Sequence, residues 1–271
     1  MKYQKEFCGE FLGTFLLVLF GCGSVAVSVL FNAHLGLFQI AMTWGIGVTL
    51  AIYATRNLSC AHLNPAVSIA MVACGRMNVK KLPIYLIAQF AGAFVAGLTI
   101  YFLFCPSIAA YEAANGIVRG TGESMATARM FGEYYHLQGN QAVVSMPLAM
   151  AAEGFGTALL VLMIFSLTDG CNAGKPDDSI APLFIGLTVT SIICLVAPLT
   201  QAGLNPARDL APRLVAALFG WSGAAFPDAT GGFFYVYVLA PIVGGLFSGL
   251  SFTRLIQPLM ARNSDACCKG K

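Results

Sequence analysis

The tripeptide Asn-Pro-Ala occurs twice in this sequence, and its residue types suit the start of a helix. The two copies are Asn64, Pro65 and Ala66, and then Asn205, Pro206 and Ala207. Asn is favoured just before a helix, and Pro is tolerated at the first helical position because the N–H that it lacks would be unpaired there. A helix start carries partial positive charge, and the Asn amide adds hydrogen-bond donors. Each copy therefore predicts a site that can donate hydrogen bonds to a polar molecule and repel a cation.

Four polar residues accompany the two tripeptides. Arg208 follows the second copy directly, and Glu10 and Glu153 stand alone within long apolar runs. An ionisable residue inside an apolar run is a functional residue by default. Two roles stay open for these carboxylates, which are accepting backbone N–H groups and coupling proton movement. His62, just before the first Asn, either faces the same site or packs beneath it.

The sequence contains no residue set typical of an enzyme or a metal centre. Neither a nucleophile–base pair nor a cluster of metal ligands lies near the tripeptides. The nine Cys show no C-x-x-C or Cys/His spacing, and most lie inside apolar runs, so we interpret them as small apolar side chains. We expect no enzyme activity, no metal and no cofactor.

The composition places these residues in a membrane protein. Of the 271 residues, 58% are hydrophobic and 10% are charged, whereas soluble domains average about 45–50% and about 25%. The net charge is only +3, and the basic residues are spread along the chain, which excludes a nucleic-acid partner. The sequence predicts the lipid bilayer as the surroundings of this protein.

Six apolar stretches are long enough to cross a bilayer, whose core of about 30 Å requires about 20 helical residues. They cover residues 7–31, 35–55, 82–105, 142–168, 179–199 and 231–253. Two shorter pieces, 64–75 and 205–220, begin with the tripeptides and would extend about half that thickness. We therefore predict one all-α membrane domain over residues 1–271, with six transmembrane helices and two re-entrant half-helices.

The distribution of Lys and Arg predicts a multi-pass protein of the cell membrane with both termini in the cytoplasm. Eleven of the 15 basic residues then lie on the cytoplasmic side, where such residues are enriched. Residues 106–141 become one long extracellular loop, and residues 257–271 a short cytoplasmic tail. A cleaved signal peptide is the alternative interpretation of the first span, but that span has an internal copy, which argues against cleavage.

The second half of the sequence repeats the first. Residues 9–19 match residues 152–162, with Glu10 opposite Glu153. Glu10 precedes Asn64 by 54 residues, and Glu153 precedes Asn205 by 52. Each repeat, about 5–105 and 142–256, holds three spans and one short segment. Because three is odd, the second copy enters from the opposite face of the membrane, and we expect the two short segments to meet at the midplane.

The backbone that leads into each tripeptide, residues 59–63 and 200–204, is predicted to be non-helical. Such backbone is tolerated at this depth only where it lines a wet cavity. Its carbonyl oxygens would then serve as acceptors along a pore. The residues assigned this role are Cys60, Ala61, His62, Gln201 and Gly203.

These motifs resemble those of the aquaporin superfamily, the major intrinsic proteins, over residues 5–256. Within it the chain is similar to the aquaglyceroporin branch, the glycerol uptake facilitators. The likeness rests on Trp44 in the second span, on Asp209 after Arg208 with Arg213 four residues later, and on the loop residues 117–120. It implies the inverted-repeat aquaporin fold and a homotetramer with one pore per subunit.

The resemblance also implies a narrow filter near the outer mouth. Structural support for the pore is predicted from carboxylates, two of which are placed symmetrically in the repeat. The filter residues are Trp44, Ile193, Ala202 and Arg208, and the supporting residues are Glu10, Glu153 and Asp209. Glycerol facilitators typically have Gly and an aromatic residue where Ile193 and Ala202 stand, and Gly in place of Cys60. For Asp209 and Arg213, an exposed surface pair and a support for Arg208 both stay open.

The function predicted from the sequence is a passive channel for small uncharged solutes. Glycerol and related polyols with water come first, because a polyol can lie along the apolar wall of Trp44 and Ile193 while Arg208 donates hydrogen bonds to its hydroxyls. Urea, ammonia and metalloid hydroxides are further candidates. The alternative is an ion- or proton-coupled secondary transporter, because inverted repeats with broken helices are common in that class.

Overall fold

The computed structural model describes residues 3–34, 36–136, 144–227 and 231–261, and within these ranges it contains helices and no strands. The six predicted spans are all present, which confirms a multi-pass membrane protein. Five spans are the helices α1 (Gln4–Phe31), α2 (Leu37–Thr55), α4 (Leu82–Ala114), α6 (Met146–Thr168) and α7 (Ala181–Thr200). The sixth runs through α10 (Gly232–Phe234), η4 (Tyr235–Leu239), α11 (Ala240–Ser251) and η5 (Phe252–Ile256).

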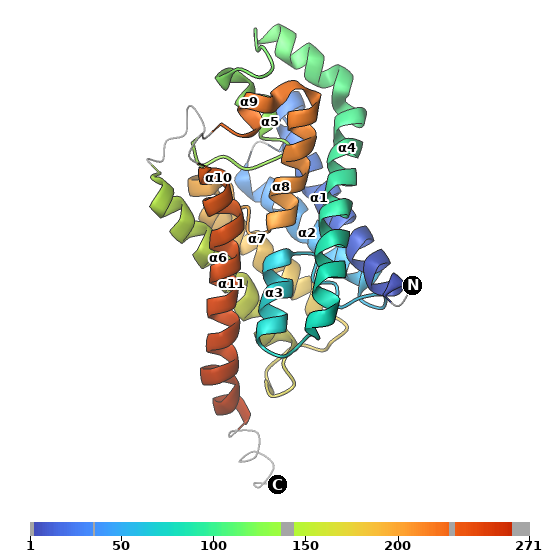
Figure 1. Ribbon diagram of the computed structural model, residues 1–271, viewed down its shortest axis with the longest axis vertical. Helices are drawn as coiled ribbons and strands as arrows, with labels where there is room; N and C mark the ends of the chain where they lie inside the picture. Colours follow the sequence, from blue (N-terminus) through green and yellow to red (C-terminus); the bar gives the residue numbers. More distant parts are fainter. Residues whose placement is uncertain (1–2, 35, 137–143, 228–230, 262–271) are drawn as a thin grey trace.

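Two short helices begin at the two tripeptides, as predicted. They are α3 (Pro65–Ala73) and α8 (Pro206–Ala216), of nine and eleven residues. At about 1.5 Å per residue, each covers about half of a bilayer core. In Figure 1, α8 lies above α3, and both lie between α4 and α11. Two half-helices thus take the place of a seventh span.

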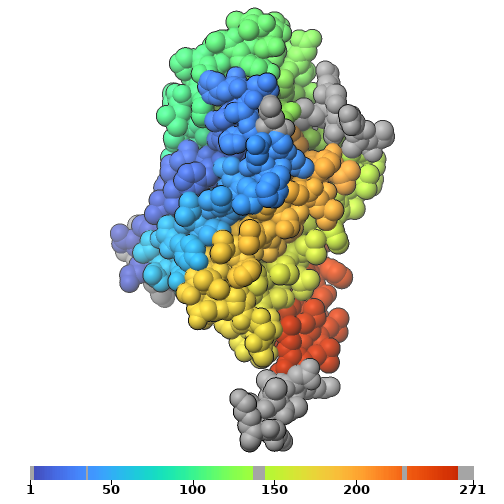
Figure 2. Space-filling view, turned by 180° about the vertical axis from the view of Figure 1, so that it is seen from behind, coloured from blue at the N-terminus to red at the C-terminus, as the bar shows by residue number. Residues whose placement is uncertain are grey.

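The long helices pack in the same pattern in both halves of the chain. Helix α1 packs on α2 and α4, α6 packs on α7 and α11, and α2 joins the halves by packing on α7. Seen from behind, these elements run side by side and inclined to the long axis (Figure 2). Helices α6 and α11 approach closely, since a Cβ atom on Gly244 would lie 1.9 Å from the carbonyl oxygen of Gly154. Small residues permit such backbone contact between membrane helices.

Helix α4 differs from the sequence prediction, which placed the end of this span at residue 105. It continues through Pro106 to Ala114. At 33 residues it measures about 50 Å, longer than a bilayer core, so its last turns extend beyond the apolar layer. Those turns are stabilised by packing, because Ile108 is fully buried and Glu112 pairs with Arg119. The connection to α6 also contains a short helix, α5 (Met125–Ala128), and is therefore not a simple loop.

Candidate pore and its constriction

The two predicted cap residues meet at the centre of the fold and link the two repeats. The Asn64 side-chain amide donates to the Leu204 carbonyl at 2.9 Å, and the Asn205 amide donates to the Leu63 carbonyl at 2.8 Å. Their side-chain oxygens accept from Ala66 N and Ala207 N, at 2.8 and 3.0 Å. Each amide group carries two N–H donors, and the link uses one of them. The second can donate to a molecule in the cavity that both Asn side chains line.

The backbone before each cap has an unusual conformation, which is the same in both repeats. Ala61 and Leu63 have φ of 49° and 54°, and the equivalent residues Ala202 and Leu204 have φ of 64° and 57°. The left-handed region costs a residue with a side chain about 1–2 kcal/mol. These segments therefore need partners that hold them in place. Thr200, predicted to begin the second segment, is instead the last residue of α7.

Glu10 and Glu153 are those partners. Glu10 accepts from the backbone N–H groups of His62 and Leu63, at 3.0 and 2.8 Å, and from the side chains of Ser59 and Gln89. Glu153 accepts from Gly203 N at 2.8 Å, Leu204 N at 2.7 Å and the Thr200 hydroxyl at 2.5 Å. Both carboxylates are fully buried. Their oxygens accept hydrogen bonds from the two backbone segments that precede the caps, residues 59–63 and 200–204. This is the geometry of a structural support.

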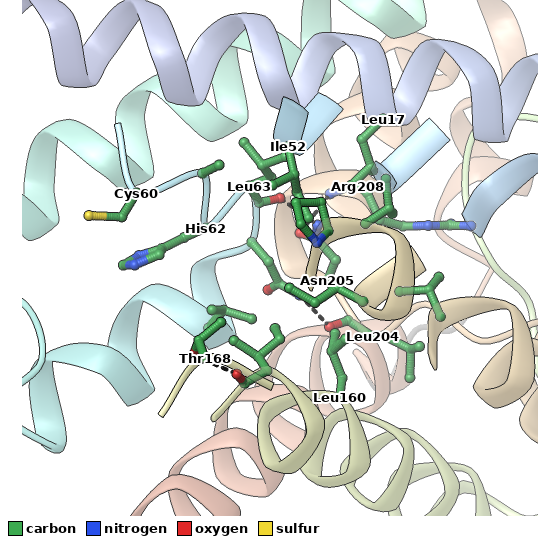
Figure 3. Close-up of a pocket in the computed structure, with 18 of the residues that line it drawn as sticks. Leu17, Ile52, Cys60, His62, Leu63, Leu160, Thr168, Leu204, Asn205 and Arg208 are labelled. Atoms are coloured by element: carbon green, nitrogen blue, oxygen red, sulfur yellow. Dashed lines mark hydrogen bonds between the residues drawn. The ribbon is translucent and has the colours of Figure 1, made fainter. Parts of the chain in front are cut away.

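A cavity of about 860 Å³ runs along these segments. One stripe of α2 lines it at helical spacing, namely Trp44, Val48 and Ile52, and Arg56, just after the last residue of α2, continues this stripe. A matching stripe of α7 consists of Ala181, Ile185, Val189 and Ile193. Twelve residues of helix span on the order of 18 Å, so the cavity extends through much of the membrane layer. Its other walls include the two backbone segments that precede the caps and apolar side chains such as Leu17 and Leu160 (Figure 3).

The residues predicted to line a pore with their carbonyls fall into two groups. Cys60, Ala61, His62 and Gly203 line this larger cavity. Gln201 instead lines a second, smaller cavity of about 190 Å³. His62 contacts both Ser68, with Nδ1 3.2 Å from the hydroxyl oxygen, and the Tyr85 ring, at 5.0 Å between centroids. In Figure 3, Cys60 and His62 lie on one side of the cavity and Arg208 on the other.

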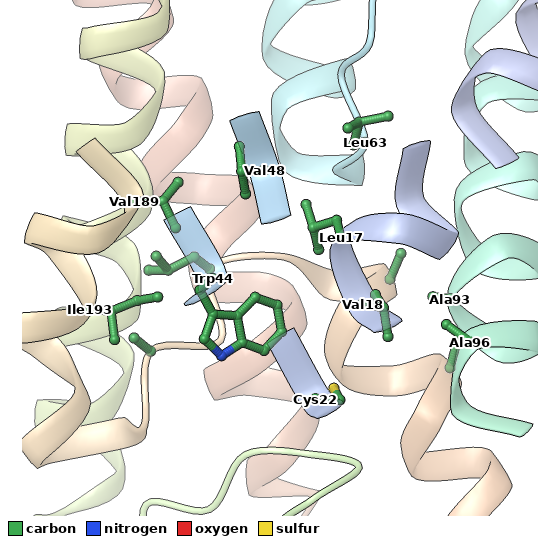
Figure 4. Packing of buried hydrophobic residues seen from close by; sticks show 14 of the residues in the cluster. Leu17, Val18, Cys22, Trp44, Val48, Leu63, Ala93, Ala96, Val189 and Ile193 are labelled. Atoms are coloured by element: carbon green, nitrogen blue, oxygen red, sulfur yellow. The ribbon is translucent and has the colours of Figure 1, made fainter. Parts of the chain in front are cut away.

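The four predicted filter residues lie close together, at the boundary between the two cavities. Trp44 and Ile193 line both cavities, whereas Arg208 and Ala202 line the larger one. The guanidinium carbon of Arg208 lies 4.1 Å from the centre of the Trp44 ring. Figure 4 shows the Trp44 indole beside Ile193. The ring packs on α1 at Gly21, where a Cβ atom would lie 2.2 Å from it.

Glu133 was missed by the sequence interpretation, although its carboxylate forms an ion pair with the Arg208 guanidinium. It comes from the connection between α5 and α6 and is 5% exposed, while Arg208 is 3% exposed. Burial raises the pKa of Glu133, and the charge of Arg208 opposes that rise. The available signal was a single Glu between Gly132 and two Tyr in an otherwise weakly patterned segment, together with the need of a buried Arg for a counter-charge.

Asp209 and Arg213 hold this Glu133 segment in place. The Asp209 carboxylate accepts from Glu133 N at 2.7 Å, and Arg213 donates to the Glu133 carbonyl at 2.5 Å. The two side chains also bond to each other, with Arg213 Nη2 2.8 Å and Nε 3.1 Å from the carboxylate oxygens. They are 0% and 1% exposed, so the alternative of an exposed surface pair is wrong. Asp209 therefore supports Arg208 indirectly, because it holds the backbone of Glu133, whose carboxylate pairs with Arg208.

Comparisons with known proteins agree with this architecture. The family model described as "Major intrinsic protein" matches residues 1–252. A glycerol uptake facilitator protein of Pseudomonas aeruginosa is 42% identical over 251 residues, covering 91% of this chain and 87% of the relative. A glycerol uptake facilitator protein of Escherichia coli is 39% identical over 251 residues, covering 91% and 86%. A propanediol uptake facilitator of Citrobacter freundii is 39% identical over 257 residues, covering 93% and 92%.

A solved structure shows the same fold. The X-ray structure of the aquaglyceroporin from Plasmodium falciparum superposes with a TM-score of 0.81 at 29% sequence identity, covering 95% of this chain and 98% of the other. Helix order, half-helices and inverted repeat are thus those of the aquaporin fold, and the chain belongs to the major intrinsic protein family.

Proposed function

We propose that this protein is a passive channel for small uncharged solutes, with glycerol and related polyols foremost and water alongside. The observation that carries the proposal is the larger cavity, in which the Asn64 and Asn205 amides face a path bounded by apolar side chains of α2 and α7. A polyol has hydroxyls for the amides and loop carbonyls and C–H edges for the apolar wall. Relatives bear the names of glycerol and propanediol facilitators.

Two features of this path oppose the passage of cations. The N-termini of α3 and α8 each present the positive end of a helix dipole, and Asn64 and Asn205 present amide N–H donors. Neutral solutes with hydroxyl or carbonyl oxygens can accept from these donors. Urea and metalloid hydroxides are therefore further candidate solutes, and ammonia is another because its nitrogen lone pair can accept from the same donors.

The coupled-transporter alternative assigns proton transfer to Glu10 or Glu153. Glu10 accepts four hydrogen bonds, three of them from residues 59–63 and one from Gln89 of α4. Glu153 accepts three hydrogen bonds, all from residues 200–204. Protonation would remove acceptors that hold left-handed backbone in place. These contacts favour structural support over proton coupling, and therefore a channel over a coupled carrier.

In the membrane, we place both termini in the cytoplasm, following the bias of Lys and Arg. The smaller cavity then faces the outside, and the Arg56 end of the larger cavity faces the cytoplasm. A homotetramer with one pore per subunit follows from the family resemblance. Cross-linking in native membranes tests the tetramer, and accessibility of Cys residues introduced near each terminus tests the orientation.

Stopped-flow light scattering on proteoliposomes tests the channel. We expect glycerol flux that rises linearly with its gradient and is unaffected by ion or proton gradients. Flux that saturates at low millimolar glycerol, or that requires such a gradient, would contradict the proposal. Ala202→Phe, at the constriction, is expected to slow larger polyols more than glycerol, whereas Ala109→Phe, on the exposed end of α4, leaves their relative rates unchanged.

A further inference from the structure

The backbone segment that contains Ala202 begins at the C-terminal end of α7. Thr200 is the last residue of that helix and is fully buried. The last four carbonyl oxygens of a helix have no partner within the helix, and a buried acceptor without a partner is costly. The Thr200 carbonyl therefore requires a donor from another part of the fold.

Tyr237 supplies that donor. Its hydroxyl donates to the Thr200 carbonyl oxygen at 3.0 Å, and the residue is 1% exposed. Its ring packs on the same segment, because a Cβ atom on Gly203 would lie 2.7 Å from Cδ1 of the ring. The guanidinium carbon of Arg213 lies 5.7 Å from the ring centre. One tyrosine therefore contacts the backbone on both sides of Ala202 and also contacts α8.

The turn that contains Tyr237 departs from α-helical geometry. It is η4 (Tyr235–Leu239), a π-helical turn inside the sixth span. Such turns are rare within α-helices and are frequent at functional sites. Tyr237 is buried and Tyr235 is 42% exposed, so this turn directs one of its two tyrosines into the protein and the other outward.

The first repeat has a tyrosine at the equivalent position. Gly92 and Gly244 make equivalent helix contacts, since a Cβ atom on them would lie 2.3 and 1.9 Å from backbone carbonyl oxygens of α1 and α6. Tyr85 and Tyr237 each precede that glycine by seven residues. Tyr85 is fully buried, and its hydroxyl accepts from Cys60 N at 3.1 Å. Each repeat thus has a buried tyrosine that bonds to the backbone leading into its cap.

The two tyrosines hold opposite ends of the larger cavity. In Figure 3, Cys60 lies on one side of this cavity and Arg208 on the other. Tyr85 bonds to Cys60, whereas Tyr237 bonds to the segment of Ala202, which lies at the constriction with Arg208. The same kind of contact therefore serves the constriction in the second repeat only.

We propose that Tyr237 is a positioning residue of the constriction, which acts through the backbone of residues 200–204 and not by contact with the solute. This inference rests on the proposed function. Tyr237 lines neither of the two cavities, whereas Ala202 lines the larger one. Gln201 and Ala202 have left-handed φ of 66° and 64°, a conformation that costs energy and is retained only where partners hold it. Without the hydroxyl, the segment relaxes and the constriction discriminates less well by solute size.

The experiment compares Tyr237→Phe with Tyr85→Phe, two variants that each lose one hydroxyl and one hydrogen bond to the backbone. Permeabilities of glycerol and of the next larger polyol, erythritol, are measured by light scattering on proteoliposomes, with the protein-free liposome rate subtracted. Tyr237→Phe is expected to lower the glycerol to erythritol ratio about two- to fivefold, the effect of losing one neutral hydrogen bond. Tyr85→Phe should keep the wild-type ratio, because its contact lies away from the constriction.

Two further variants guard the interpretation. Gly203→Ala keeps the hydroxyl but places a Cβ atom against the Tyr237 ring, so the ratio should fall here too, independently of how well Tyr237→Phe folds. Tyr235→Phe, which removes the exposed hydroxyl of the same turn, should leave both permeabilities as in wild type.

The outcomes separate positioning from a general loss of stability. Folded Tyr237→Phe with the wild-type ratio and intact glycerol flux would overturn this proposal and leave the channel function standing. An equal fall of the ratio in Tyr85→Phe would overturn it as well, because the effect would then not be specific to the constriction. If Tyr237→Phe does not fold, a wild-type ratio in Gly203→Ala overturns it. Absence of glycerol flux in wild type would instead refute the proposed function itself.

Discussion

Replacement of Asp209 by Asn tests whether a buried pair positions the constriction. The carboxylate accepts three hydrogen bonds, from Glu133 N and from two nitrogens of Arg213. The Asp209→Asn variant would retain one side-chain oxygen but leave the buried Arg213 without its counter-charge. Removing one partner of a buried ion pair costs about 3–5 kcal/mol. A loss of 1 kcal/mol lowers the melting temperature of a chain of about this size by about 2–4 °C, so we expect a shift on the order of 10 °C.

The assay is thermal unfolding of the purified protein in detergent, at one fixed heating rate for all variants. Asp178→Asn is the matched control, because the Asp178 side chain is 81% exposed and its ion pair, among the described residues, is with Lys175. An exposed pair contributes about 0–1 kcal/mol, so this control should melt close to wild type. Because Asp209 holds Glu133, which pairs with Arg208, the Asp209→Asn variant should also change the relative permeabilities of glycerol and larger polyols. Equal melting temperatures for Asp209→Asn and Asp178→Asn would refute the reasoning.

Further predictions concern helix contact, constriction charge and one ion pair. Gly244→Ala should destabilise the protein by about 1–3 kcal/mol or more, since its Cβ would lie 1.9 Å from a backbone oxygen of α6, whereas Gly23→Ala, with open space around it, should not. Burial raises the pKa of Glu133, so acidification should protonate it before an ordinary Glu and remove its ion pair with Arg208, which should change the glycerol permeability of wild type but not that of Glu133→Gln. Burial would raise the pKa of Asp169, but a backbone N–H and Arg76 outweigh it and hold that pKa below the ordinary 3.8. Asp169→Asn should therefore lower the melting temperature at neutral pH, and the difference from wild type should vanish as pH falls through the lowered pKa.

Local patterns were sufficient to predict the elements of this fold. Runs of about 20 apolar residues predicted each span, and Asn followed by Pro predicted where α3 and α8 begin. Prediction failed at Pro106, where a residue that usually ends a helix lies inside α4. Packing overrode that local preference, because the turn beyond Pro106 buries Ile108 completely.

The candidate site was only partly visible in the sequence. Trp44, Ile193, Ala202 and Arg208 could be named from the family resemblance, and the structure brings them to one boundary between two cavities. Glu133 belongs to no repeat and no apolar periodicity, so nothing local marked it. Its backbone N–H meets Asp209 across 76 residues of chain. Such a contact depends on how the α4–α6 connection packs against α8.

The sequence by itself determined that the chain crosses a membrane, that its halves are inverted copies, and that two capped half-helices face each other. The spans and the capped half-helices follow from hydrophobicity and helix capping, which depend on short stretches of chain. The inversion follows from the odd number of spans in each repeat. Tertiary structure alone decided that Arg208 is neutralised by Glu133 and that Asp209 and Arg213 are buried beneath that pair. The physical reason is desolvation, because a buried charge requires a counter-charge, and only the packed fold decides which distant residue supplies it.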